Sequence, residues 1–211
     1  FKYKGKYYFC ASDLHGWNSS HSYYMVADHI FGPYSNWMVM DGTDNDFSHV
    51  TQTGFFYTIK GSKQETVLFC GDRWSDFAGN GIGYNQWVPL TVDGNKVKFN
   101  SLSEFHLNAQ TGEWKAGEKN NYILNPSFEA DRVTTENMAG WKSSGIGNTN
   151  ISNGRTGNFC MTQWSDKDYK STLSQSISLP NGTYTLKAFA KSGGNFNESY
   201  IYIKVKIRLL V

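Results

Sequence analysis

The sequence predicts an all-β protein, and three observations predict it. Short runs rich in aromatic and β-branched residues recur along the 211-residue chain, and clusters of Gly, Asn, Asp and Ser separate them. No stretch combines an apolar period of 3.6 residues with helix-capping residues. The chain has 14 Phe, 13 Tyr and 7 Trp, and aromatic residues favour strands. Ordinary core packing explains most of this aromatic content, and the binding of sugar rings is the functional alternative.

The first part of the chain is expected to contain about eight short strands at hairpin spacing. Asp93 and Gly94 are a tight-turn signal between the sixth and seventh of these strands, at residues 85–91 and 96–100. Such a series of strands is typical of propeller blades or of a β-sandwich. The expected strands cover residues 6–12, 22–28, 36–40, 54–59, 66–71, 85–91, 96–100 and 103–107.

A change of pattern divides the chain into two predicted domains. Residues 109–121 are polar and turn-rich, so we expect a boundary there, between a domain of residues 1–117 and a domain of residues 118–211. The second domain has a Gly/Asn/Ser-rich loop at 143–157 and reads as a β-sandwich of the jelly-roll kind. Its expected strands cover residues 158–164, 172–179, 183–190 and 200–207.

The charge and hydropathy of the chain exclude several classes of protein. Lys and Arg number 20 and Asp and Glu number 18, which gives a net charge of +2. Because no basic run is present, we expect no nucleic-acid partner. No apolar run reaches eighteen residues, so no membrane-spanning segment is expected.

The three cysteines point to neither disulfides nor a metal site. Their odd number argues against a disulfide framework. Cys10 and Cys70 lie in apolar, strand-like runs, as free buried thiols do. No Cys/His ligand spacing is present, so we expect no structural zinc and no metal-binding residues.

Polar and aromatic side chains gather where predicted strands begin or end. The four segments are SDLHGWN at 12–18, SHVTQTG at 48–54, GDRW at 71–74 and YNQWVPL at 84–90. Each has a purely structural interpretation, such as a loop cap, a local Asp–Arg pair or a core Trp. In a propeller, however, such strand ends converge on one funnel, and this convergence favours a ligand site.

The carboxylates alone do not identify a catalytic pair. Glycoside hydrolysis needs two carboxyl groups on either side of the scissile bond, but no spacing here marks an acid and its partner. Most of the candidates lie in turn sequences, where Asp forms local hydrogen bonds. The candidates by residue type are Asp13, Asp41, Asp44, Asp46, Asp72 and Asp76.

The order of several motifs resembles glycoside hydrolase family 43. FKYKGKYYFCASDLHGWNSS, FGPYS, SHVTQTGFF, GDRW and YNQWVPL occur in that order over residues 1–117, and they look most like the branch with exo-β-1,3-galactanases. The resemblance implies a five-bladed β-propeller, of which this chain would hold the last blades. It also implies that the general acid, a Glu, precedes the segment matching FKYKGKYY and therefore lies outside this chain.

The same resemblance assigns roles to residues at the strand ends. Gln52 in HVTQT matches a Gln proposed to orient the attacking water in an inverting reaction, since a neutral amide is a poor base. Room for that water is a requirement of inversion. The expected substrate-binding residues are Trp17, Asn18, His49, Asp72, Arg73, Trp74, Tyr84 and Trp87.

The second domain resembles a galactose-binding-like β-sandwich of the kind appended to glycosidases. NPSFEADR followed by Gly140 and Trp141 carries this resemblance. Glu129 matches a position that often binds a structural Ca²⁺ in such modules, although a surface carboxylate is the simpler interpretation. No other cofactor is expected, and the resemblance implies a partial sandwich.

These observations favour part of a galactan-type glycosidase that cleaves O-glycosidic bonds in plant-type glycans. We expect the chain alone to be inactive, because the general acid would be missing. The alternative is a non-catalytic carbohydrate-binding protein. The expected partner is an oligo- or polysaccharide, with self-association through open sheet edges. A secreted or periplasmic location follows by analogy with polymer-degrading enzymes.

Overall fold

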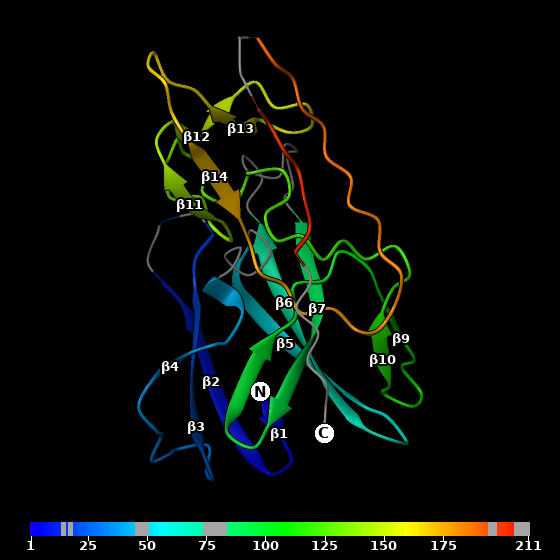
Figure 1. Ribbon diagram of the computed structural model, residues 1–211. Helices are drawn as coiled ribbons and strands as arrows, with labels where there is room; N and C mark the ends of the chain where they lie inside the picture. The colour runs from blue at the N-terminus through cyan, green and yellow to red at the C-terminus, as the bar shows by residue number, and fades with distance from the viewer. Residues whose placement is uncertain (14–15, 17–18, 45–50, 74–83, 194–197, 205–211) are drawn as a thin grey trace, which may run out of the picture. The chain divides into compact units, whose positions relative to one another are not determined.

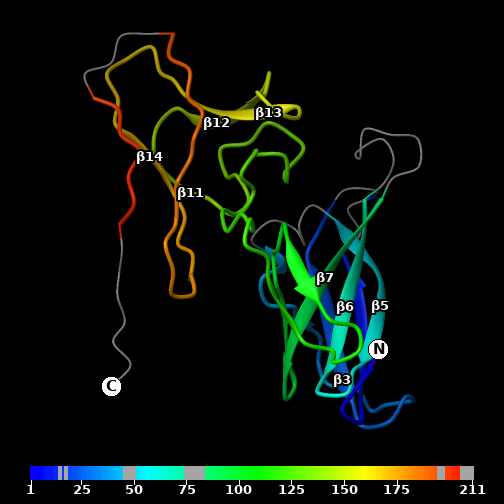
Figure 2. The ribbon, with the colours of Figure 1, turned by 90° about the vertical axis from the view of Figure 1, so that its right-hand side faces the viewer.

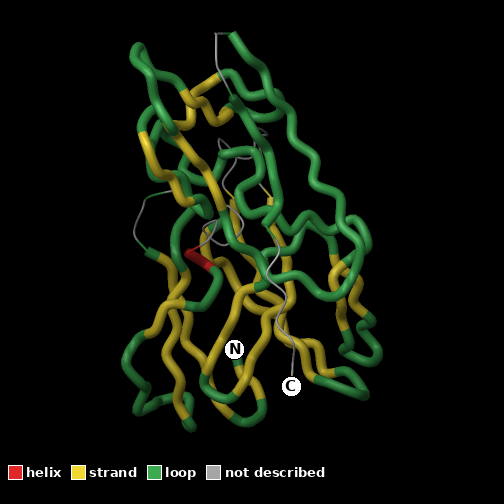
Figure 3. The backbone as a smooth tube through the Cα atoms, in the orientation of Figure 1, coloured by secondary structure: helices red, strands yellow, loops and turns green. Residues whose placement is uncertain are grey.

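The computed structural model describes residues 1–13, 16, 19–44, 51–73, 84–193 and 198–204. These residues form strands, turns and one short helical segment at residues 43–44, drawn red in Figure 3. None of the described helical residues makes a helix long enough and apolar enough to cross a bilayer. The chain divides into two compact units, Phe1–Ile177 and Ser178–Val211.

Two four-stranded antiparallel sheets account for the first hundred residues (Figure 1). In each sheet, strands that are consecutive in sequence are neighbours, which is the meander of a propeller blade. None of the sheets closes on itself, and the predicted all-β class is confirmed. The first sheet contains β1 (Lys2–Tyr3), β2 (Lys6–Ser12), β3 (Ser22–Ala27) and β4 (Met38–Val39). The second contains β5 (Gln52–Lys60), β6 (Glu65–Arg73), β7 (Tyr84–Asp93) and β8 (Lys96–Phe99).

The predicted turn between the last two of these strands is confirmed. Asp93 pairs with Lys96, so β7 and β8 are joined by a two-residue turn. Gly94 has a φ of 55° there, which glycine adopts without the steric cost of a side chain.

The hydrophobic core lies between the two sheets and draws residues from both. Phe69 of β6 is fully buried, and its ring meets the rings of Phe56 and Phe99 edge-on at 5.6 and 5.1 Å. Tyrosine hydroxyls also join the sheets at the β7–β8 turn: Tyr8 donates to the Gly94 carbonyl at 3.0 Å and Tyr24 donates to the Asn95 carbonyl at 3.1 Å. The two sheets therefore share one core and are fastened at one end.

The polar segment in which the domain boundary is predicted contains a strand. β10 (Trp114–Ala116) pairs with β9 (Phe105–Leu107) in a hairpin. Gly112 provides the turn with a φ of 78°. The part of this segment before residue 117 is folded with the preceding strands, because Trp114 and Ala116 both pack on the core.

The sandwich-like region departs further from its predicted strands. The loop expected at 143–157 contains β11 (Lys142–Gly145) and β12 (Asn148–Ser152). β12 pairs with β13 (Phe159–Gln163), and β11 pairs with β14 (Ser171–Ser174), which ends before the expected residue 179. These pairs form two separate two-stranded sheets, visible in Figure 2.

The strands expected at 183–190 and 200–207 are not present in the described part of the second unit. Residues 178–193 and 198–204 have no strand, and all of them are exposed. A strand needs a neighbouring backbone to satisfy its N–H and C=O groups, and an alternating sequence alone does not supply one. The predicted boundary at 117/118 stays a prediction.

Candidate functional site

The ends of β5, β6 and β7 bring three polar residues into one cross-strand row. Gln52 is opposite Asp72, and Asp72 is opposite Asn85. Directly opposed residues point to the same face of a sheet, so the three side chains share a face. Asn85 Nδ2 donates to Asp72 Oδ1 at 3.4 Å and to the Gly71 carbonyl at 3.5 Å. The row therefore presents an amide, a carboxylate and a second amide side by side.

The side chain of Gln52 also contacts the loop that follows β2. Its Nε2 donates to the Gly16 carbonyl at 2.6 Å, which fixes the orientation of the amide group. The next residue, Thr53, places its hydroxyl 2.6 Å from the hydroxyl of Ser22, the first residue of β3. Alternate residues of a strand point to opposite faces. Gln52 thus faces the Asp72 row while Thr53 binds the neighbouring sheet.

Aromatic residues continue the Asp72 face away from the row. The next same-face row is Phe55, Cys70 and Trp87. Trp87 is 43% exposed, and its ring meets that of Phe55 edge-on at 5.8 Å. Trp87 is therefore not a buried core residue, and its exposed ring lies on the same face as Gln52 and Asp72.

The other predicted site residues fall into two groups. Trp17, Asn18, His49 and Trp74 lie outside the described residues. Tyr84 belongs to β7 opposite Arg73, but its side chain is outside what the structure describes. Arg73 is half-buried at the end of β6.

Arg132, in the segment that precedes β11, is close enough to Arg73 for the charge of Arg73 to affect its pKa. Desolvation by burial lowers the pKa of Arg132 to about 10, and the positive charge of Arg73 contributes to the shift. Glu129 acts in the opposite direction and raises this pKa. This end of the sheet therefore carries two cations, which favour an anionic or hydroxyl-rich neighbour.

A second polar cluster lies at the junction of β2 and β3, and it joins Asp13, a candidate carboxylate of the sequence, to His21 and Tyr23, which the sequence analysis did not single out. The Tyr23 hydroxyl donates to Asp13 Oδ2 at 3.1 Å, and His21 Nδ1 is 3.7 Å from the same oxygen. Desolvation and the hydrogen bond to Asp13 raise the pKa of Tyr23. The signal that was available for His21 and Tyr23 is their i, i+2 spacing where β3 begins, because in an extended backbone it places both on one face.

One group of side chains has the composition of a metal site. Glu104, His106 and Glu118 place one ligand atom each within 4.8 Å of one another. An imidazole with two carboxylates suits a transition metal better than Ca²⁺. In the structure His106 Nε2 is hydrogen-bonded to Glu118 Oε2 at 2.7 Å, and Lys115 donates to the other Glu118 oxygen at 3.1 Å. His106 and Glu118 are therefore hydrogen-bonded to protein groups in this structure.

Glu129, the expected calcium ligand, has a structural contact. Its Oε1 accepts a hydrogen bond from the backbone N–H of Phe159 at 2.7 Å. The carboxylate also approaches Gly157, where a Cβ would come within 2.5 Å of Oε1. Glu129 thereby holds the turn before β13, and calcium binding stays a prediction.

Comparison with known proteins gives structural likenesses alone. No family model matches the sequence, and no curated protein matches it. The exo-β-1,3-galactanase of Phanerochaete chrysosporium, solved with galactose, matches with a TM-score of 0.49 and 19% identity over 76% of this chain. The exo-β-1,3-galactanase of Clostridium thermocellum matches with a TM-score of 0.48 and 19% identity over 74% of this chain.

The chain spans 33% of the length of the first of these enzymes and 39% of the second. At this identity and TM-score, the likeness does not extend to activity or substrate. The architecture described above therefore rests on the strands and pairings of this chain itself.

Proposed function

We propose that this chain is part of a glycoside hydrolase that cleaves galactan-type glycans with inversion, as the motif resemblance implies. The observation that carries the proposal is the row of Gln52, Asp72 and Asn85 at one end of a four-stranded sheet. A row of amides and a carboxylate beside an exposed tryptophan has the groups that bind sugar hydroxyls and sugar rings.

In this proposal Gln52 positions the attacking water. Its Nε2 is already engaged by the Gly16 carbonyl at 2.6 Å, so the amide oxygen is the group that would accept a hydrogen bond from the water. An amide does not take up a proton at neutral pH, so its contribution is orientation. Asp72 and Asn85 would bind substrate hydroxyls, and Trp87 would contact a sugar ring.

The general acid is proposed to come from outside residues 1–211. The 211-residue chain should therefore bind β-1,3-galactan oligosaccharides but not hydrolyse them. Incubation with β-1,3-galactotriose, followed by chromatography of the released galactose, tests this directly. Release of galactose above a buffer blank would overturn the assignment of the acid. Absence of binding as well as turnover would overturn the site.

Substitution of Gln52 tests its role, with a control residue in the same sheet. In an enzyme that includes this chain, Gln52→Ala should lower kcat about 100-fold or more, as loss of a positioning contact can, with little change in Tm. Gln86 is the matched control, because it lies one residue beyond Asn85, opposite Gly71 on the other face. Gln86→Ala should leave kcat within about 2-fold. Equal kcat values for the two variants would remove Gln52 from the mechanism.

The non-catalytic alternative predicts a different pattern in the same assays. A carbohydrate-binding protein would bind galactotriose through Asp72, Asn85 and Trp87, with no turnover even when the whole protein is present. Trp87→Ala would then abolish binding, while Gln52→Ala would change nothing but affinity. Hydrolysis by the whole protein would exclude this alternative.

A further inference from the structure

A cavity of about 320 Å³ lies at the end of the β5–β8 sheet that is opposite to the Gln52 row. Glu65 borders the cavity, and Asp72 of the Gln52 row lies seven residues further along β6. At about 3.3 Å per residue, the two are roughly 23 Å apart. The cavity is therefore separate from the site proposed for hydrolysis.

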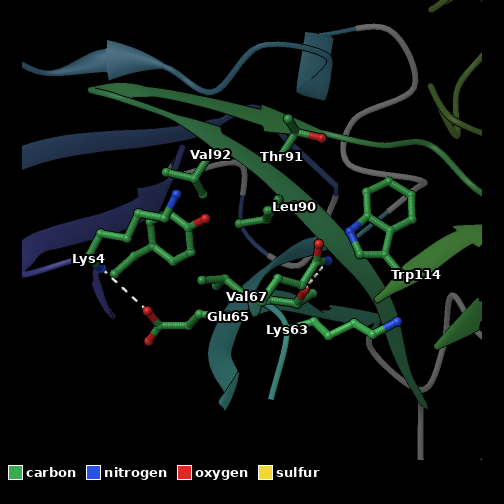
Figure 4. Close-up of a pocket in the computed structure, with 11 residues that line it drawn as sticks. Lys4, Lys63, Glu65, Val67, Leu90, Thr91, Val92 and Trp114 are labelled. Atoms are coloured by element: carbon green, nitrogen blue, oxygen red, sulfur yellow. Dashed lines mark hydrogen bonds between the residues drawn. The ribbon is translucent and has the colours of Figure 1, made fainter. Parts of the chain in front are cut away.

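The cavity combines an apolar floor with polar and aromatic walls (Figure 4). Val67, Leu90 and Val92 form the floor, and the Trp114 side chain lies across from Lys4 and Glu65. Its volume is at the lower end of the roughly 300–1,000 Å³ that ligand sites occupy. The lining residues are Tyr3, Lys4, Lys63, Gln64, Glu65, Thr66, Val67, Leu90, Thr91, Val92 and Trp114.

Close contacts with the β5–β6 turn hold the β9–β10 hairpin, which carries Trp114, in place. A Cβ on Gly61 would come within 2.1 Å of the Gly112 nitrogen, so the β5–β6 turn and the β9–β10 hairpin touch through glycine. The Gly112 carbonyl accepts hydrogen bonds from Gln64 Nε2 at 2.8 Å and from Thr66 Oγ1 at 2.6 Å. The wall is therefore tied to the sheet, and Trp114 is positioned before any ligand binds.

Positive charge is concentrated around this cavity. A second hollow of about 420 Å³ shares Lys4 and Glu65 with it and adds Lys2 and Lys60 to the lining. Four lysines and one glutamate thus line the two hollows. Glu113, which pairs with Lys63 at 3.0 Å, adds one more carboxylate. This small region has a net charge of +2, as large as that of the entire chain.

We propose that this cavity is a second saccharide site, selective for sugars that carry a carboxylate. Trp114 would contact the sugar ring, as aromatic faces do with sugar C–H groups, and the threonine and glutamine groups would bind hydroxyls. Lys4 and Lys63 would attract the carboxylate as point charges. An anion without a ring would not use Trp114, and a neutral sugar would not use the lysines.

The test titrates the 211-residue chain with two disaccharides that differ in one group. One is galactobiose, and the other is the same disaccharide with a galacturonate in place of the galactose at its non-reducing end. Binding is followed by amide chemical shifts. The acidic disaccharide should bind at least about 5-fold more tightly, one paired charge being sufficient for that ratio. The preference should fall as NaCl is raised from about 50 to 500 mM, because salt screens exposed charges.

Substitutions separate the contribution of the Trp114 ring from that of the lysine charges. Trp114→Ala should weaken binding of the acidic disaccharide about 10-fold, whereas Trp164→Ala, at a tryptophan that is 69% exposed and lies outside both proposed sites, should leave it unchanged. Lys4→Asn combined with Lys63→Gln should remove the preference for the acidic sugar but keep weak binding of both. Asn is chosen because Lys4 has a φ of 46°, which Asn tolerates.

Each other outcome overturns the proposal. Equal affinity for the two disaccharides would show a neutral-sugar site, and displacement by equimolar inorganic phosphate would show a site for anions alone. Binding that survives Trp114→Ala in a variant with an unchanged Tm would place the sugar elsewhere. Galactotriose hydrolysis depends on the opposite end of β6, so failure here leaves the proposed function intact, and the reverse also holds.

Discussion

At the scale of single residues, the pKa of Glu118 reports a local pair that can be tested directly. The hydrogen bond from His106, followed by that from Lys115, lowers the pKa of Glu118 from its ordinary 4.5 to about 2. A carboxyl group whose pKa is lowered in the folded state stabilises that state at every pH above its ordinary pKa. This stabilisation is lost as the pH falls from about 4.5 toward 2. The His106–Glu118 contact is thus expected to break in acid.

The prediction is that the Glu118 carboxyl carbon titrates near pH 2 in the unaltered chain and nearer 4.5 in His106→Gln. A carbon-detected NMR titration measures both values. Lys115→Met should shift the pKa in the same direction by a smaller amount, because Lys115 is the second cause. Since Glu118 is exposed, neither substitution should change Tm by more than about 1 °C. An unchanged titration in His106→Gln would contradict the structure.

Residues at the candidate site differ in how far the sequence could predict them. Gln52 and Asp72 could be found because each stands where an apolar strand meets a polar loop, and the hairpin register then makes them neighbours. Asn85 could have been added by the same register. The Asp13–Tyr23 contact could have been added from the β2–β3 register, because Ser12 pairs with Ser22 at the end of that hairpin and Asp13 is the next residue.

At the scale of secondary-structure elements, one tyrosine ties β3 to the β7–β8 turn. The Tyr24 hydroxyl donates to the Asn95 carbonyl at 3.1 Å and accepts from the Val97 N–H at 3.2 Å. Tyr24 is 4% exposed. Tyr24→Phe would leave a buried backbone donor without its partner, which costs about 1–3 kcal/mol.

Urea unfolding measures this cost and should show a lower midpoint with an unchanged m-value. Tyr34→Phe is the matched control. Its hydroxyl donates to the Ile30 carbonyl at 2.9 Å on the surface, where water can replace it, so the change should be within about 0.5 kcal/mol. Similar losses for both variants would show that the Tyr24 contact does not fasten the sheets.

The strands that could be predicted are those with a partner close in sequence. β2, β3 and β5 to β8 form hairpins with their neighbours, so apolar runs and turns define them together. β11 pairs with β14, more than twenty residues away, and its KSSG sequence has no strand pattern of its own. Conversely, residues 183–190 alternate as a strand does, but no described backbone pairs with them. Long-range pairing is the information that local pattern lacks.

At the scale of the whole molecule, the two units differ in how they bury apolar surface. Phe1–Ile177 contains the shared core. The described part of Ser178–Val211 instead exposes large apolar side chains: Phe189 is 74% exposed, Tyr200 72% and Tyr202 74%. A contiguous exposed apolar stretch with high β-propensity favours association between chains. Together with the open edges of the sheets, this exposed stretch predicts self-association of the chain.

Deleting residues 178–211 should therefore reduce association while leaving the fold intact. Light scattering of the 211-residue chain should show a particle size that rises with concentration, and the 1–177 chain should show a constant, monomeric size. Because the core belongs to the first unit, Tm should change by less than about 2 °C, equivalent to less than about 1 kcal/mol at this chain length. Association that persists in the 1–177 chain would assign it to the sheet edges, which this deletion leaves in place. A Tm lowered by more than about 5 °C would show that the second unit contributes to the stability of the first.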